Sequence, residues 1–388
     1  MTWVALVVGV LVLGATTFDI VGTLVVPREV HSPLSRAVAF AVRQAMFAVC
    51  RPIHTYLRRD RILAWGGPLM LLVRLLVWVA LFLVGFALVL LPATGGDLGR
   101  ALDEAGSSLF TLGYSPPTNS ASAVVDYVAA YAGLIVVAVQ IGYLPTLYAA
   151  FNRRETEVTM LVARAGMPAW GPELLLRTRF GIPDGNVVHP GLNELFDRWE
   201  RWSAEVAESH TTYPTLIWFR SPRGWRHWLI AQLAVLDAAA LHLSLAPSID
   251  PRVRARLCLR MGFTALGQIA AALHLSVDED PDPNGSISVT FEQFETAVQQ
   301  LAAVNYPIEV SAEVAWPHFR GWRANYESLA FAIAYNIDAP PALWSGPRRW
   351  SEQEVAPFRP SDRVAEDADL RPYRSARNPH SDPPITEP

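Results

Sequence analysis

Residues 107–117 read SSLFTLGYSPP and lie between two long apolar runs of the chain. A short amphipathic segment comes directly before them. Asp97 can cap a helix that runs from Leu98 to about Phe110. The apolar residues of this helix recur at i, i+3, i+4 and i+7 and give it one apolar face: Leu98, Ala101, Leu102, Ala105 and Leu109. The helix is too short to cross a membrane, so this region is expected to form a re-entrant loop.

Three apolar segments are long enough to cross a bilayer, whose hydrocarbon core of about 30 Å needs roughly 20 mostly apolar residues. They run from Trp3 to Val26, from about Pro68 to Leu91 and from about Val124 to Phe151. The first is not expected to be a cleaved signal peptide, because no basic region precedes it and no small-residue cleavage site closes it. The predicted fold class is all-α, with transmembrane helices, the re-entrant loop and a helical cytoplasmic domain.

The arginines predict the orientation. Seven lie between the first and second apolar segments: Arg28, Arg36, Arg43, Arg51, Arg58, Arg59 and Arg61. Between the second and third segments Arg100 is the one basic residue, and more arginines follow the third. The positive-inside rule therefore places the N-terminus outside and the C-terminal domain in the cytoplasm of a multi-pass protein of the inner (plasma) membrane.

The order of spanning helix, short helix, Thr-x-Gly-Tyr and spanning helix resembles the pore module of the potassium channel superfamily, over about residues 66–152. Its filter is usually written T-V-G-Y-G. The runs E-S-H (208–210), Y-P (213–214) and F-R-S (219–221), with A-P-P-A-L-W at 339–344, are similar to a bacterial family of potassium-channel-like proteins. The resemblance implies a homotetramer that conducts potassium ions passively, without a cofactor.

In such a filter, backbone carbonyls replace the water shell of the ion. The filter residues that the resemblance implies are Thr111, Leu112, Gly113, Tyr114 and Ser115. Ser115 stands where the family has a second glycine, and Pro116 and Pro117 follow in place of an aspartate. Two alternatives stay open for this reason: a weakly selective monovalent cation channel, and a non-conducting membrane scaffold or sensor that keeps the pore fold.

Three residues of the third segment suit a gate. Gly133 and Gly142 permit bending or close helix packing, and Pro145 removes a helical hydrogen bond near the cytoplasmic end. The alternative is that glycine and proline are simply frequent in membrane helices.

Two ionisable residues fall inside spanning segments, Asp19 in the first and Arg74 in the second. Counted at about 1.5 Å per residue, they lie at similar depth, which favours an ion pair. The functional alternative is a water-lined ion path or a gating charge.

The loop between the first two segments contains a near-helical apolar pattern, with arginines between: Leu34, Val38, Val42, Met46 and Val49. It predicts an amphipathic helix on the inner leaflet, where anionic lipid attracts the arginines. Packing of that helix on the cytoplasmic domain is the equal alternative.

The predicted domains are residues 1–27 (first transmembrane helix), 28–65 (interfacial segment), 66–152 (pore module), 153–345 (cytoplasmic helical domain) and 346–388 (disordered tail). In the cytoplasmic domain, His210, Tyr213 and Arg220 could bind a small anion or nucleotide, although an interhelix turn is favoured. Residues 227–245 are apolar enough for a fourth span, but their polar residues favour a buried domain helix.

Several function classes find no support in the sequence. A net charge of −4 gives no general attraction to nucleic acid. Two distant cysteines, Cys50 and Cys258, form neither a disulfide framework nor a zinc site. We found no nucleophile–base pattern, metal spacing or phosphate-binding glycine loop. The chain is therefore not expected to be an enzyme, and potassium at the filter carbonyls is the one metal expected.

Overall fold

The computed structural model describes residues 2–24, 26, 33–177, 190–276, 278 and 280–358. These residues form helices and no strand, which confirms the all-α prediction. The chain begins with α1 (Thr2–Leu24), and two further helices follow it before the second apolar segment: α2 (Pro33–Cys50) and α3 (Tyr56–Leu63). Then come α4 (Gly66–Leu90), α5 (Leu98–Leu109) and α6 (Ser120–Ala165).

The rest of the described chain forms a helical bundle. Its elements are α7 (Gly171–Leu176), α8 (Pro190–Thr212), the 3-10 helix η2 (Pro214–Trp218), α9 (Trp228–Leu245), α10 (Arg252–Ala272), α11 (Phe291–Ala303), α12 (Ala312–Ala324) and α13 (Glu327–Ile337). Helices α12 and α13 are separated by a break at Asn325 and Tyr326.

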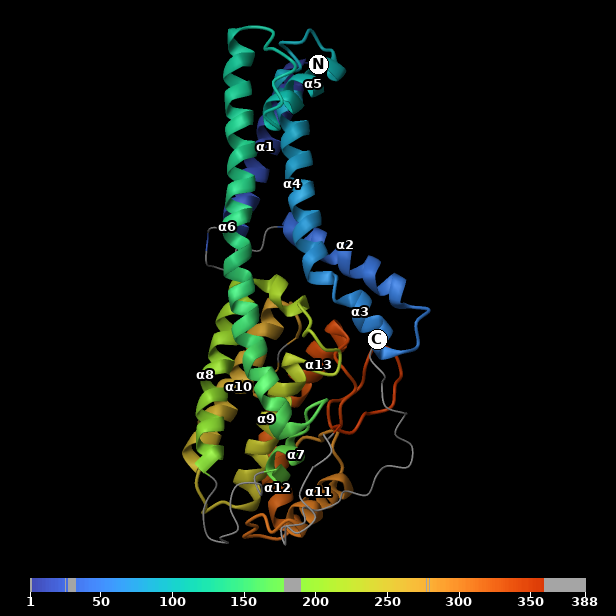
Figure 1. The fold of residues 1–388 in the computed structure, drawn as a ribbon, viewed down its shortest axis with the longest axis vertical. Coiled ribbons are helices and arrows are strands. Elements are labelled where there is room, and N and C mark those ends of the chain that lie inside the picture. Colours follow the sequence, from blue (N-terminus) through green and yellow to red (C-terminus); the bar gives the residue numbers. More distant parts are fainter. Residues whose placement is uncertain are drawn as a thin grey trace, which may run out of the picture.

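Helix α6 connects the two halves of the molecule (Figure 1). Its upper part lies beside α1 and α4, and its lower part lies among α7, α8 and α9. With 46 residues it is about 69 Å long, far more than a bilayer core requires. The helix passes through Pro145 and through the expected domain boundary at residue 152 without ending.

Four helical segments in the described part of the chain are long and apolar enough to cross a membrane: Thr2–Leu24, Tyr56–Leu90, Ser120–Ala165 and Trp228–Leu245. The first three leave many apolar side chains exposed, such as Leu11, Leu76 and Leu134. In the fourth, α9, every residue is buried. Helix α9 is thus enclosed by other parts of this protein, as expected for the core helix of a domain.

Buried polar contacts hold α9 in that core. Arg323 of α12 is fully buried and forms ion pairs with Asp237 of α9 and with Glu327. The Tyr326 hydroxyl donates a hydrogen bond of 2.8 Å to the same Asp237 carboxylate. Because each buried charge has a partner, these groups are compatible with an otherwise apolar interior.

Residues 346–358 differ from the disordered tail that the sequence predicts there. We name them the C-terminal strap. The Trp350 ring packs edge-on against Phe47 of α2 at 5.8 Å between centroids, and the Arg59 guanidinium lies 4.5 Å from the Trp350 centroid. The Phe358 amide donates to the Met167 carbonyl at 2.7 Å. The packed domain therefore extends at least to Phe358, and residues 359–388 lie outside the described part.

Candidate functional site

Helix α5 fills the space between α4 and α6 near the end of the molecule that carries the N-terminus (Figure 1). As expected, Asp97 is its N-cap and accepts a hydrogen bond of 3.2 Å from the Arg100 amide. On its inner face Ala101, Ala105 and Leu109 are buried. They share one apolar cluster with three aromatic residues of α4, Trp78, Phe82 and Phe86.

The carboxyl end of α5 rests on Gly133 of α6. A Cβ atom at this glycine would lie 2.1 Å from the Leu109 carbonyl oxygen, so no other residue fits without moving α5. Gly133 stands thirteen residues after Ser120, which is about 20 Å along α6. At Gly142, by contrast, a Cβ atom would meet nothing within 4 Å. The two glycines that the sequence pairs as hinges therefore have different surroundings.

The segment after α5 has an unusual backbone. Thr111 has a φ of 55° and Gly113 a φ of 70°, both in the left-handed region. That conformation is free of strain for glycine but not for threonine, and such strain persists only where the surroundings impose it. Ser115 is not among the described residues with positive φ. The backbone of Ser115 is accordingly not in the left-handed region and is unstrained here.

Ser107 holds this segment in place by accepting hydrogen bonds from its backbone amides. The Ser107 carbonyl accepts from the amides of Leu112 at 2.8 Å and Gly113 at 3.3 Å, and its hydroxyl accepts from the Ser115 amide at 3.0 Å. The carbonyls of residues 111–114 accept no hydrogen bond from any described residue. The amide side of the segment is thus anchored and the carbonyl side is left free.

Glu104 anchors the return of the chain. This carboxylate is 1% exposed and accepts hydrogen bonds from the Thr118 amide at 3.3 Å and the Thr118 hydroxyl at 2.9 Å. Asn119 then caps α6 through a capping box with Ser122. Neither Ser107 nor Glu104 was predicted as a site residue. A carboxylate in the middle of a short helix within an apolar region was the available signal for Glu104.

Two side chains of the segment point out of the protein. Leu112 is 65% exposed and Tyr114 is 61% exposed. Along α6 a row of exposed residues continues this apolar surface: Val124, Tyr127, Val128, Tyr131, Leu134, Val137 and Ile141. Within the described chain nothing covers this surface.

The direct ion pair predicted between Asp19 and Arg74 does not form, because Trp78 stands between them. The Asp19 carboxylate accepts hydrogen bonds from the Trp78 indole and, at 3.1 Å, from the Ser35 hydroxyl. The Arg74 guanidinium lies 5.2 Å from the centroid of the Trp78 ring. Both Nε and one Nη atom of Arg74 are buried without a hydrogen-bond partner among the described residues. Arg74 and Trp78 stand one turn apart on the same face of α4, and it is Trp78 that contacts Asp19.

His210, Tyr213 and Arg220 do not converge on one site. His210 is fully buried, and its Nε2 atom lies 3.0 Å from a nitrogen of the Arg154 guanidinium. Tyr213 packs its ring against Tyr143 of α6 at 5.5 Å. Arg220 is buried with Asp60 and donates to the backbone carbonyls of Ile337 and Asp338. These contacts favour the structural interpretation of the segment over an anion or nucleotide site.

These contacts instead join the helical domain to the spanning helices. Arg154 lies in the lower part of α6 and donates to the carbonyls of Leu216 at 2.9 Å and Phe219 at 2.7 Å. Phe219 and Leu216 in turn pack with Leu71 of α4 and Leu147 of α6. A displacement of η2 and its flanking residues would therefore be transmitted to the parts of α4 and α6 that adjoin the helical domain.

The buried histidine gives a prediction about pH. Burial and the neighbouring Arg154 guanidinium lower the pKa of His210 well below its usual value of 6.5. Below about pH 6.5 the unfolded chain therefore binds a proton that the folded chain does not. Stability should be full above that pH and fall as the pH is lowered, by up to about 1.4 kcal/mol per pH unit from this group.

The measurement is the melting temperature of the purified protein between pH 8 and pH 5. The variant His210→Gln keeps an acceptor for Arg154 but cannot be protonated, so its melting temperature should fall less over this range. Equal pH dependence of the two proteins would show that His210 does not contribute.

Comparisons with protein-family models, with curated proteins and with solved structures find no match to this chain. The described residues also contain no group of three or more His, Cys, Asp and Glu side chains that could hold a metal ion. The function is therefore inferred from the geometry around residues 97–119.

Proposed function

We propose that this chain is one subunit of a homotetrameric, potassium-selective channel, in which residues 111–115 form the filter. The observation that carries the proposal is the asymmetry of the segment. Its amides are bound to Ser107, whereas the carbonyls of residues 111–114 have no hydrogen-bond partner in the described chain. Free carbonyls in a membrane-embedded region are costly unless they bind something polar, and a dehydrated cation is such a ligand.

The position of α5 supports a re-entrant loop. The helix begins at Asp97, just after the end of α4, and ends against Gly133, about 20 Å below the start of α6. The chain then returns to Asn119 at that start. The carboxyl end of α5 carries partial negative charge and would face a central cavity, which favours cations.

One chain supplies one set of carbonyls, and a closed ring requires copies around an axis. Four copies would bury the exposed Leu112 and Tyr114 side chains and part of the exposed row on α6 against neighbouring subunits. This assignment accounts for side chains that a single chain leaves uncovered.

The alternative of a weakly selective cation channel is favoured by one observation. Ser115 lacks the positive φ that the family's second glycine allows, and its amide is bound to the Ser107 hydroxyl. The outermost carbonyl ring would then differ from that of a selective filter.

Gating is proposed to involve α6 and the helical domain. Helix α6 continues from the filter region to Arg154 as one element, and Arg154 is bound to the segment that carries η2. A movement of the domain would thus move the inner ends of the α6 helices, where Pro145 weakens the helix.

The test is potassium flux into liposomes that contain the purified protein. Gly113→Ala places a side chain at a φ of 70°, which costs about 1–2 kcal/mol and displaces the free carbonyls. We expect at least a tenfold loss of flux with the tetramer retained. Gly14→Ala is the matched control, because a Cβ atom there meets nothing within 4 Å.

Equal potassium flux in the Gly113→Ala variant and the Gly14→Ala control would contradict the assignment of the filter. Sodium flux equal to potassium flux in the wild type would favour the weakly selective alternative.

A further inference from the structure

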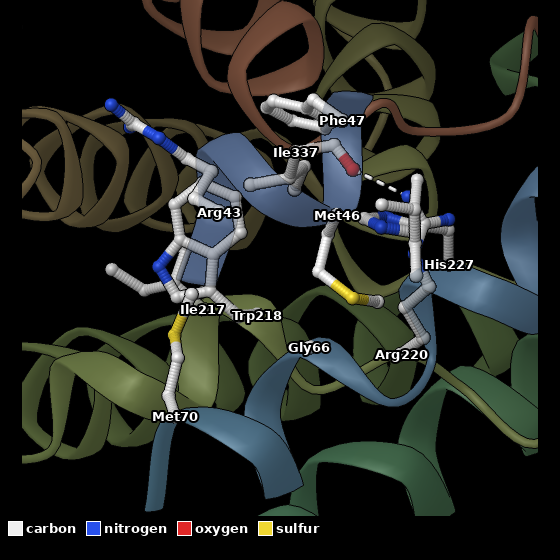
Figure 2. A pocket seen from close by; sticks show the side chains of 11 residues that line it. Arg43, Met46, Phe47, Gly66, Met70, Ile217, Trp218, Arg220, His227 and Ile337 are labelled. Atoms are coloured by element: carbon white, nitrogen blue, oxygen red, sulfur yellow. Dashed lines mark hydrogen bonds between the residues drawn. The ribbon is translucent and has the colours of Figure 1, made fainter. Parts of the chain in front are cut away.

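Two arginines lie over aromatic rings around α2, Arg349 over Phe47 and Arg43 over Phe40 and Trp218. The guanidinium of Arg349, in the C-terminal strap, lies 4.4 Å from the Phe47 centroid and 4.8 Å from the Tyr335 centroid. Arg43 lies one turn before Phe47 on α2, with its guanidinium 5.6 Å from the Trp218 centroid. Figure 2 shows this guanidinium directed away from the side chains of Arg220 and His227.

Among the described residues, neither Arg43 nor Arg349 has an acidic partner. Within the described part of the chain, the side chains of both form no ion pair and donate no hydrogen bond, although both lie over aromatic rings. Burial and the charge of Arg349 lower the pKa of Arg43, which means that the two cations repel each other. Two cations that repel each other and have no described acidic partner favour the binding of an anion that contacts both.

Three nearby carboxylates form ion pairs with other arginines. Asp60 pairs with the buried Arg220, and both Asp338 and Glu352 pair with the buried Arg59. Other exposed arginines of the region also lack a described carboxylate partner, namely Arg36, Arg51, Arg58 and Arg61. In the described part of the chain, the surface around α2 and α3 is therefore positively charged, and these arginines have no carboxylate to neutralise them.

This surface adjoins the spanning helices. Val38 and Val42 of α2 pack against Met70, in the first turns of α4. Aromatic and aliphatic side chains next to the arginines are exposed: Phe40 is 54% exposed, Val49 58% and Trp65 66%. Exposed apolar residues among arginines beside a spanning helix are typical of an interfacial amphipathic helix.

We propose that Arg43 and Arg349 together bind the phosphate of an anionic phospholipid, which fastens the C-terminal strap to α2 at the membrane surface. The cavity between α2, α4 and η2 is not this site. It holds about 20 Å³, room for a single water, and is lined mainly by apolar side chains such as Met46 and Met70. The inference requires membrane insertion but not ion conduction.

The test uses the full-length protein in neutral detergent, with phosphatidylglycerol or phosphatidylcholine added as mixed micelles. Phosphatidylglycerol should raise the melting temperature of the wild type, and phosphatidylcholine should not. The variants Arg43→Gln and Arg349→Gln each lose hydrogen bonds to a charged group, so each should need roughly tenfold more phosphatidylglycerol for the same shift.

Arg43→Gln has a second signature. Because it removes the repulsion from Arg349, the variant should be at least as stable as the wild type when no lipid is added, and yet respond less to phosphatidylglycerol. If Arg43 had only a structural role, Arg43→Gln would lower the melting temperature both with and without phosphatidylglycerol. Arg254→Gln, which changes an exposed arginine of α10, is the control and should respond like the wild type.

Two outcomes would overturn the proposal. In the first, Arg43→Gln and Arg349→Gln respond to phosphatidylglycerol as the wild type does. In the second, inorganic phosphate stabilises the protein as well as phosphatidylglycerol does at equal concentration, which would assign the site to a soluble anion. Neither outcome depends on flux, so a failure here is distinguishable from a failure of the channel proposal.

Discussion

Gly133→Ala is expected to abolish most potassium flux and to lower the stability of the protein. The new Cβ atom would lie 2.1 Å from the Leu109 carbonyl oxygen, a backbone atom that cannot rotate away. The carboxyl end of α5 must then move by about 1 Å, and overpacking of this kind costs about 1–3 kcal/mol. Since Ser107 on the same helix binds the amides of Leu112, Gly113 and Ser115, the carbonyls of residues 111–114 would move with it. Flux and melting temperature measure the two effects.

Gly142→Ala is the matched control on the same helix. A Cβ atom at Gly142 meets nothing within 4 Å, and alanine is the better helix former by about 1 kcal/mol. This variant should be as stable as the wild type or more so. If flux is lost in Gly142→Ala but kept in Gly133→Ala, bending at Gly142 would matter and the packing role of Gly133 would be wrong.

Arg220→Met is expected to separate the helical domain from the spanning helices. Arg220 is 9% exposed, pairs with Asp60 and donates to the carbonyls of Ile337 and Asp338. Methionine fills similar space but leaves the Asp60 carboxylate buried without its partner. Removal of one member of a buried ion pair costs about 3–5 kcal/mol, which corresponds to a melting temperature roughly 6–20 °C lower.

The same substitution at an exposed ion pair provides the comparison. Arg254 pairs with Asp197 at the surface, where the two side chains are 46% and 34% exposed. Such pairs contribute about 0–1 kcal/mol, so Arg254→Met should melt within a few degrees of the wild type. If the two variants melt alike, the contacts of Arg220 do not hold the domain in place.

The sequence predicted those features that depend on neighbours along the chain. The Asp97 cap, the short α5 helix and three long apolar helices follow from local periodicity and length, and the structure has them. The anchors Ser107 and Glu104 were not predicted, because their partners at residues 112–118 are set by how the loop returns. A local pattern does not contain that information.

The Asp19–Arg74 prediction failed for a related reason. Residue counting gives the depth of a side chain in a helix but not the neighbour that its face meets, and here Trp78 occupies the place between the two charges. The domain contacts were equally inaccessible. Arg220 meets Asp60 from 160 positions away, and nothing near either residue indicates the pairing. The C-terminal strap was misjudged because its few aromatic contacts lie in a charged, proline-rich segment.

The measurement that tests the central claim most directly is an experimental structure of the purified assembly in potassium chloride. The account predicts four copies around one axis, with the carbonyls of residues 111–114 facing it and ion density between their rings. This result does not depend on whether the gate is open. A dimer or monomer, or a tetramer whose axis lies away from residues 111–115, would contradict the account.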